Sequence, residues 1–223
     1  MKIIHLLLGS LLILAACKKD NYLVDHGGTD VERIRKMSSY EFLKESKVLD
    51  TVVLLIDRAG MKEEINGDIT FFSPTTVGVN RFLAQQTKAI QRKYNNENIK
   101  FTLDSLSTDS IKFYLRRHIF KGVIDKKALG YSKKPFTNIN NEGNYFLLLE
   151  KYYIDVSGIR STTNRIQIRR VFGQADEDVP PGTENREPDF YAYIQTSEVR
   201  TATGMVHVLE ADANLGFYIY REN

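Results

Sequence analysis

Cysteine is the scarcest chemistry-bearing residue in this 223-residue chain, because it occurs once, at Cys17. A single cysteine cannot form a disulfide within the chain or a zinc cluster, so the fold must be held by its hydrophobic core. Tryptophan is absent, but 12 Phe and 12 Tyr are present, an aromatic content typical of a sheet-rich domain. A chain of this length can bury such a core and favours one or two domains.

Catalytic motifs are also absent from the sequence. The four histidines, at positions 5, 26, 118 and 207, are isolated and never form a His-Glu-x-x-His pair. The chain has no Gly-x-Ser-x-Gly elbow, no phosphate-binding glycine loop and no dinucleotide fingerprint. The paired carboxylates of glycoside hydrolases are set by the fold and leave no sequence signature. The sequence therefore favours a protein that is not an enzyme, with a hydrolase of envelope polymers as the least favoured alternative.

The charges of the chain are nearly balanced. The formal net charge is +3, whereas nucleic-acid-binding proteins usually carry a strongly basic face. Asp176 and Asp178 are carboxylates that suit calcium, but their segment lacks the spacing of an EF-hand. We therefore expect no nucleic-acid partner and no metal, and we interpret the segment as a solvated acidic loop.

The N-terminus has the layout of a secretory signal. Lys2 is followed by an apolar stretch over residues 3–14, which is shorter than the roughly 20 residues of a membrane-spanning helix. Leu14-Ala15-Ala16-Cys17 then resembles a bacterial lipobox, at which the leader is removed and Cys17 receives a covalent lipid. The alternative is an ordinary cleavable leader with an unrelated cysteine. We expect residues 1–16 to be the signal peptide, and beyond the lipid we expect no cofactor.

The residues after Cys17 predict a lipidated tether over 17–37, followed by one domain over 38–223. The Lys18-Lys19-Asp20 start resembles the charged signal that sends some Bacteroidetes lipoproteins to the cell surface. We therefore predict a lipid anchor in the outer membrane with the domain at the cell surface, and the periplasmic face is the alternative.

Periodicity and capping residues predict the main elements of the domain. Ser38 and Glu41 have capping-box spacing, and a helix from Val48 to Ala59 is followed by Gly60 as its cap. A polar segment over 91–100 predicts a surface loop, and a proline-rich, acidic one over 174–189 predicts a long hairpin loop. Expected strands cover residues 69–72, 119–124, 145–149, 165–172, 190–199, 205–209 and 217–220.

Three segments, in order, resemble the fasciclin (FAS1) family. They are Ile-Thr-Phe-Phe-Ser-Pro-Thr-Thr at 69–76, Leu-Arg-Arg-His-Ile-Phe-Lys-Gly at 115–122, and Gly-Met-Val-His-Val-Leu-Glu at 204–210. The resemblance implies an α+β fold, a mixed β-sandwich or wedge with helices packed around it. It also implies a binding or adhesion module without catalysis. The motif residues expected to have structural roles are Phe72, Pro74, Thr75, His118, Gly122, Gly204 and His207.

The two motif histidines have a structural and a functional interpretation. A buried neutral imidazole can accept one hydrogen bond and donate another, and so can join a helix end or a loop to a sheet. The alternative makes them metal ligands or catalytic bases. We also expect Gly204 to supply a turn conformation that other residues resist.

The chain departs from the family pattern at Thr76, Arg117 and Thr203. In some animal relatives an Asp-Ile pair before the third motif binds integrins; here that pair falls on Glu198 and Val199, so the integrin role does not transfer. These positions remain interface candidates together with exposed features of the long loop and its following strand. The candidates named by residue are Asp176, Asp178, Tyr191, Glu198 and Val199, and in the alternative that the chain is an accessory subunit of a complex, the loops over 91–100 and 174–189 and the aromatic cluster Phe190-Tyr191-Tyr193 are further candidates.

Two functional hypotheses follow from the resemblance. The leading one is an outer-membrane lipoprotein that acts in adhesion or in binding a protein or glycan partner at the cell surface. The alternative is an accessory subunit of an outer-membrane barrel complex, such as a glycan or peptide uptake system. Asp104-Ser105-Leu106 also resembles an O-glycosylation acceptor of Bacteroidetes, which makes Ser105 a candidate for modification.

Overall fold

The computed structural model describes residues 29–156, 159–180, 183 and 188–217. The chain divides into two units, residues 1–32 and 33–223, and only residues 29–32 of the first are described. The helices are α2 (Thr29–Arg35), α3 (Ser39–Glu45), α4 (Asp50–Ala59), α5 (Lys62–Ile65), α6 (Thr76–Tyr94) and α7 (Thr108–Arg116), with short 3-10 turns η1 (Lys47–Leu49), η2 (Leu103–Ser105), η3 (Lys126–Ala128) and η4 (Asp176–Asp178). The strands are β1 (Ile69–Ser73), β2 (Ile119–Lys121), β3 (Lys134–Phe136), β4 (Tyr145–Val156), β5 (Ile159–Arg170), β6 (Phe190–Arg200) and β7 (Met205–Leu209).

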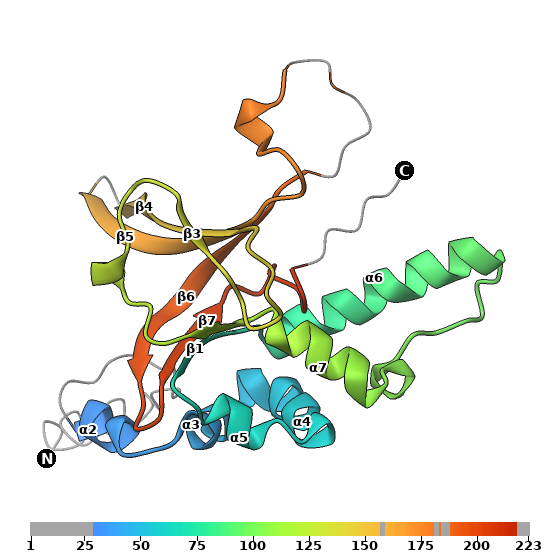
Figure 1. Ribbon diagram of the computed structural model, residues 1–223, viewed down its shortest axis with the longest axis horizontal. Helices are drawn as coiled ribbons and strands as arrows, with labels where there is room; N and C mark the ends of the chain where they lie inside the picture. The colour runs from blue at the N-terminus through green and yellow to red at the C-terminus, as the bar shows by residue number, and fades with distance from the viewer. Residues whose placement is uncertain (1–28, 157–158, 181–182, 184–187, 218–223) are drawn as a thin grey trace, which may run out of the picture. The chain divides into compact units, whose positions relative to one another are not determined.

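The strands form one mixed sheet in the order β2-β1-β7-β6-β5-β4-β3 (Figure 1). Only β1 and β7 pair in parallel. The first half of β6 pairs with β5 and its second half with β7, so β6 joins two smaller sheets. An antiparallel bridge between Phe120 and Asn138 connects β2 to the segment after β3, which brings the two ends of the sheet together. The predicted α+β fold, with its mixed sandwich or wedge of strands and surrounding helices, is therefore confirmed.

Two hydrophobic cores lie on the two sides of the parallel pair. Phe71, Val206 and Val208 face the first core, which contains the buried side chains of α3, α4 and α7. Phe72 and Leu209 face the second core, which the inward side chains of β4, β5 and β6 complete. Both faces of β1 and β7 are therefore buried, as expected for a parallel pair. In Figure 1, helices α4, α6 and α7 lie on the side of β1 and β7 that faces the first core.

The helix start predicted at Ser38 agrees with the structure in detail. Ser38 accepts a hydrogen bond from the N–H of Glu41 (3.2 Å), and the Glu41 carboxylate accepts one from the N–H of Ser38 (2.8 Å), which completes the capping box. Gly60 ends α4 in the left-handed conformation, with φ at 63°. Regular structure is also present before Ser38, because α2 occupies part of the expected tether. Arg33 in the last turn of α2 pairs with Glu45 of α3 at 2.6 Å.

Several boundaries differ from the predictions. Helix α6 continues to Tyr94, so the expected loop over 91–100 is helical in its first part; Gln91 holds the turn by donating to the carbonyl of Ile99 at 2.8 Å. Strands β4 and β5 are 12 residues each, longer than predicted. Strand β3 was not predicted because it has three residues and includes Pro135. Of the strand expected over 217–220, Phe217 has a positive φ of 50° and lies outside any strand, while 218–220 lie outside the described residues.

Candidate binding surface

His118 lies at the junction between α7 and β2, completely buried. Its Nδ1 is 2.9 Å from the carbonyl oxygen of Phe72, and its Nε2 accepts a hydrogen bond from the N–H of Gly216 at 2.8 Å. These partners assign a neutral ring with its proton on Nδ1, because a carbonyl can only accept. Burial lowers the pKa of His118 to about 3. The ring joins the end of α7 to β1 and to the segment after β7.

His207 has the equivalent role in the middle of β7. Its Nε2 is 2.8 Å from the carbonyl oxygen of Ile124, and its Nδ1 accepts from the N–H of Glu198 at 3.2 Å. The ring stacks on Phe72 with centroids 4.9 Å apart. Burial lowers the pKa of His207 to about 4. Because both nitrogens of each motif histidine bind the backbone, neither imidazole has a lone pair that faces a substrate.

The other motif residues surround these histidines or form the first helix junction. Phe72 is completely buried, and Thr75 caps α6 by accepting from the N–H of Gly78 at 3.2 Å. Pro74 separates the end of β1 from that cap without needing a backbone donor. Gly122 has a positive φ of 70°, which suits glycine after β2.

Gly204 acts differently from the expectation. It has no positive φ, so the predicted special turn conformation is wrong. A Cβ at this position would lie 2.6 Å from the carbonyl oxygen of Ile69, closer than real side chains approach a backbone atom. Gly204 is therefore required because β7 begins against the backbone before β1.

The three departures from the family pattern each make a contact of their own. Arg117 binds the Glu142 carboxylate through Nε (3.2 Å) and Nη2 (3.0 Å). Hydrogen bonds and charge from Arg117 lower the pKa of Glu142 against the opposing effect of its burial. Thr76 accepts from the N–H of Thr51 at 3.3 Å, and Thr203 accepts from the N–H of Ser39 at 3.0 Å.

Opposite the second core, β4, β5 and β6 present an outer face with a different composition. The register sets Phe146, Arg169 and Tyr191 in one row across the three strands, and Leu148, Gln167 and Tyr193 in the next. We call this surface the tyrosine–arginine face; it consists of Phe146, Leu148, Arg165, Gln167, Arg169, Tyr191 and Tyr193. Tyr191 is its most exposed member, at 40%.

Each tyrosine of this face stacks on an arginine. The guanidinium carbon of Arg165 lies 3.3 Å from the Tyr193 ring centroid, and that of Arg169 lies 4.7 Å from the Tyr191 ring centroid. Gln167 donates to the Tyr193 hydroxyl at 3.1 Å. Partial burial raises the pKa of Tyr191. The face is therefore a fixed platform of aromatic rings and not a set of mobile side chains.

The acidic loop is attached to the same face. Arg169 binds both Asp189, whose side chain is fully buried, and Glu177, which also pairs with Lys133. The N–H of Asp176 donates to Asp189 at 3.0 Å, and the N–H of Asp189 donates back to Asp176 at 3.1 Å. The prediction of a solvated acidic loop is therefore wrong at its base, where carboxylates are committed to Arg169 and to the backbone. Asp178 lies in η4 and is exposed.

The second predicted interface pair lies on another part of β6. Glu198 occupies a bulge with a positive φ of 61°, and its carboxylate accepts from the N–H of Lys126 at 3.0 Å. Val199 is partly buried against the first core. The structure therefore places Glu198 and Val199 away from Tyr191, and it does not bring the five candidates together in one surface. Cys17 lies outside the described residues.

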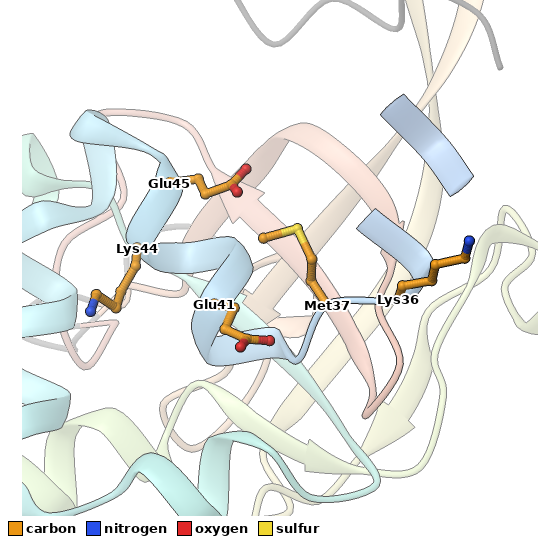
Figure 2. Close-up of a pocket in the computed structure, with 5 residues that line it drawn as sticks. All are labelled: Lys36, Met37, Glu41, Lys44 and Glu45. Carbon is orange, nitrogen blue, oxygen red and sulfur yellow. The ribbon is translucent and has the colours of Figure 1, made fainter. Parts of the chain in front are cut away.

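A shallow depression lies beside α3 in the described part of the chain (Figure 2). Lys36, Met37, Glu41, Lys44 and Glu45 line it, and Lys36 and Lys44 point to opposite sides of the view. Glu45 is already paired with Arg33, and the hydrogen bond from the Ser38 backbone lowers the pKa of Glu41. Its acids are thus engaged within the fold. Across the described ranges no cluster of three or more His, Cys, Asp or Glu side chains is arranged to hold a metal ion.

Comparisons with known proteins gave matches at the level of structure, among them a fasciclin domain pair. No family model matches the sequence, and no curated protein matches it. The fold is similar to a solved FAS1 domain pair from the insect cell adhesion molecule fasciclin I, with a TM-score of 0.48 and 13% identity. The match covers 80% of this chain and 50% of that one, so the chain spans about half the length of the domain pair. This is the family that the three sequence motifs resemble, and the likeness concerns the fold.

Tyr191 and Tyr193 were expected from the sequence as interface candidates, whereas the arginines and the other members of the tyrosine–arginine face were not. Its signal is present as alternation: Arg165, Gln167 and Arg169 alternate with Ile166 and Ile168. Such a pattern indicates a strand with one open face. The pairing of these arginines with Tyr191 and Tyr193 depends on the register of two strands about 25 residues apart, which the pattern of one strand does not contain.

No helix in the described ranges is long and apolar enough to cross a membrane.

Proposed function

We propose that this protein is a non-catalytic lipoprotein, anchored in the outer membrane through Cys17, that binds a protein or glycan partner through the tyrosine–arginine face. The observation that carries this proposal is the pair of Tyr–Arg stacks on the open side of β5 and β6. The cell adhesion protein whose domain pair matches the fold offers a precedent for such a role.

The composition of the face suits recognition. Tyrosine and arginine are the residues most enriched at the centres of protein interfaces, because they combine large contact area with directed hydrogen bonds. Strand-borne tyrosines that are already stacked lose little conformational entropy on binding. The arginines are paired internally, Arg165 with Glu150 at 3.0 Å and Arg169 with Asp189. A nearly neutral partner surface, such as a glycan or the aromatic patch of a protein, therefore fits the face better than a highly charged one.

The buried histidines support a role without catalysis. A general base needs a nitrogen or oxygen within reach of a substrate proton. His118 and His207 are completely buried, and both nitrogens of each ring contact backbone groups. We assign them to stability, and we assign binding to the surface of β4, β5 and β6.

The test is extraction of the intact lipoprotein from native membranes in mild detergent, through a C-terminal tag. We expect a partner in stoichiometric amount with the wild type, and at least about tenfold less with Tyr191→Ala/Tyr193→Ala, as expected for loss of interface hot spots. Tyr94→Ala is the matched control, because Tyr94 is an exposed tyrosine (61%) on α6. If the double variant retains the partner, the tyrosine–arginine face is not the binding surface. If no protein is recovered, the purified wild type and the same two variants are tested for binding to neutral glycans.

The identity of the partner separates the two functional hypotheses. A co-purifying barrel would establish the accessory-subunit alternative. A matrix protein or glycan would establish adhesion. The anchor is tested separately by Cys17→Ser, which should release the protein from the membrane fraction because the lipid is the attachment. Membrane retention of Cys17→Ser would contradict the lipoprotein assignment and leave the tyrosine–arginine face untouched.

A further inference from the structure

The β4–β5 hairpin extends past the strands that flank it. The two strands pair along 12 residues, from Tyr145 with Arg170 to Val156 with Ile159. Strand β3 accompanies β4 only as far as Leu147, and β6 accompanies β5 only over Gln167–Arg170. The distal half of the hairpin is therefore a two-stranded ribbon. Two-stranded ribbons are marginally stable alone and gain stability from a third strand.

A backbone hydrogen bond of Leu149 shows which residues of β4 point their N–H and C=O groups away from β5. The N–H of Leu149 donates to the carbonyl of Gly130 at 2.8 Å, outside the β4–β5 pair. Residues two apart in a strand point the same way, so the backbone groups of Lys151 and Tyr153 also face outward. Among the described residues, no backbone group bonds to this edge beyond Leu149. The edge thus presents a row of free donors and acceptors with a defined register.

The neighbouring edge strand β3 is protected against the addition of further strands, unlike the open part of β4. Strand β3 is short and carries Pro135 and Lys134. Proline and lysine on a short edge strand are common means of blocking the addition of further strands. The sequence of β4 contains no proline.

The surroundings of the open edge indicate the chemistry of its occupant. Tyr131 and Tyr153 lie beside it and are 57% and 63% exposed. Lys151 lies 5.6 Å from the Tyr131 ring centroid, and Lys134, on the same face of the sheet, donates to the carbonyl of Ala128 at 3.0 Å. Neither lysine pairs with a carboxylate in the ranges that the structure describes. The edge therefore combines open backbone groups, exposed aromatic rings and two positive charges without counter-charges.

We infer that an extended acidic segment of a partner protein adds to the open edge of β4 as a further strand. Backbone hydrogen bonds to Lys151 and Tyr153 hold it, and its acidic side chains face Lys134 and Lys151. Strand addition supplies affinity through the backbone and specificity through alternate side chains. This site is distinct from the tyrosine–arginine face, which occupies the opposite side of the sheet.

The test uses the purified chain and a fluorescent peptide of sequence Thr-Glu-Val-Glu-Thr-Glu-Val. The peptide is expected to add antiparallel to β4. In that orientation, when its glutamates lie on the lysine face, their amide groups point at β4, whereas the amide groups of Thr and Val point away. We expect N-methylation of the glutamate amides to weaken binding at least about tenfold, and N-methylation of the Val amides to leave it unchanged. Equal affinities of the two methylated peptides, or no binding of the parent peptide, would overturn the inference.

Variants of the protein locate the binding site. Tyr153→Pro removes an outward N–H without breaking the β4–β5 pair, and should abolish peptide binding. Tyr153→Thr keeps the N–H and a good strand former, and should retain most of it. Lys151→Glu should weaken the acidic peptide about tenfold, and the same peptide with lysines in place of glutamates should then bind better. If Tyr153→Pro binds as the wild type does, the edge is not the site.

Two further outcomes discriminate among occupants. Loss of peptide binding in Tyr191→Ala would place the peptide on the tyrosine–arginine face and overturn the edge assignment. Sedimentation of the purified chain tests for a second copy on the edge. A concentration-dependent dimer that Tyr153→Pro abolishes would assign the edge to self-association instead of an acidic partner.

Discussion

The two halves of the sheet differ in how they are covered. Strands β1 and β7 are buried at every position, because helices cover one face and the second core covers the other. Strands β5 and β6 bury Ile166 and Ile168 on one face, whereas the other face carries Arg165, Arg169 and Tyr191; Tyr191 is 40% exposed there, and Arg169 is itself buried. The motifs that resemble a known family lie in or next to the covered half.

This difference separates stability from recognition. A residue in β1 or β7 contacts two cores, and its change is expected to disturb the fold. An exposed residue on the outside of β6, such as Tyr191, has one free face, so the sequence there can change at little cost to the core. The motif residues therefore report which fold the chain has, and the open half contains the features that distinguish this chain.

The largest expected effect comes from removing an aromatic side chain in the covered half. Phe72→Ala deletes a fully buried ring that packs on His207 and Phe120, and should lower the free energy of unfolding by about 3–5 kcal/mol. Tyr191→Ala, with one face free, should lower it by less than about 1 kcal/mol. Urea unfolding of both variants measures the contrast, and similar losses would break the distinction between the two halves.

One charge in the open half should behave like a core residue. Arg169→Met leaves the buried carboxylate of Asp189 without its counter-charge and should lower the free energy of unfolding by about 3 kcal/mol. Arg165→Met is the matched control, since the Arg165 side chain is 23% exposed and its partner Glu150 is accessible to water. The control should lose no more than about 1 kcal/mol. An equally mild effect of Arg169→Met would show that Asp189 finds another partner.

Acid should destabilise the covered half through its histidines. The folded-state pKa is about 3 for His118 and about 4 for His207, below the ordinary value of 6.5. The unfolded chain therefore binds protons that the folded chain excludes. The free energy of unfolding is at its full value above pH 6.5 and decreases as the pH falls below 6.5. Each histidine should account for a loss of roughly 2 kcal/mol at pH 5. When the free energy of unfolding is measured from pH 7.5 to pH 5, His207→Gln should reduce its pH dependence by the share of one histidine. An unchanged pH dependence would contradict the assignment of His207 as a buried neutral ring.

A further effect concerns the close approach of Gly204, just before β7, to the start of β1. Gly204→Ala places a Cβ against the Ile69 carbonyl and should lower the free energy of unfolding by about 1–3 kcal/mol. Gly130→Ala adds the same methyl group with the nearest atom 4.0 Å away, and thermal unfolding should hardly change. Equal melting temperatures for the two variants would remove the packing role of Gly204.

Local signals accounted for much of the fold before the structure was known. The capping box at Ser38, the Gly60 cap and the buried strand before Pro74 depend on neighbouring residues, and each was predicted at its observed position. The end of α6 was predicted less well, because Gln91 keeps a polar segment helical by bonding to the carbonyl groups of residues further along the chain.

Long-range features of the site could not be predicted in the same way. The base of the acidic loop looked solvated because Asp189 and Arg169 are 20 residues apart, and nothing local shows that they form a buried pair. The role of Gly204 was assigned to its own conformation, whereas the structure shows that the backbone near Ile69 requires it. In both cases the deciding contact comes from another strand.

The central claim is that the open face of β5 and β6 is covered by a partner in the membrane. Hydroxyl-radical footprinting of native membranes, compared with the purified chain, measures this directly, with the exposed Tyr94 as the internal reference. We predict that Tyr191 and Tyr193 are oxidised several-fold less in membranes while Tyr94 is oxidised equally in both samples. Equal oxidation of Tyr191 and Tyr193 in the two samples would contradict the claim.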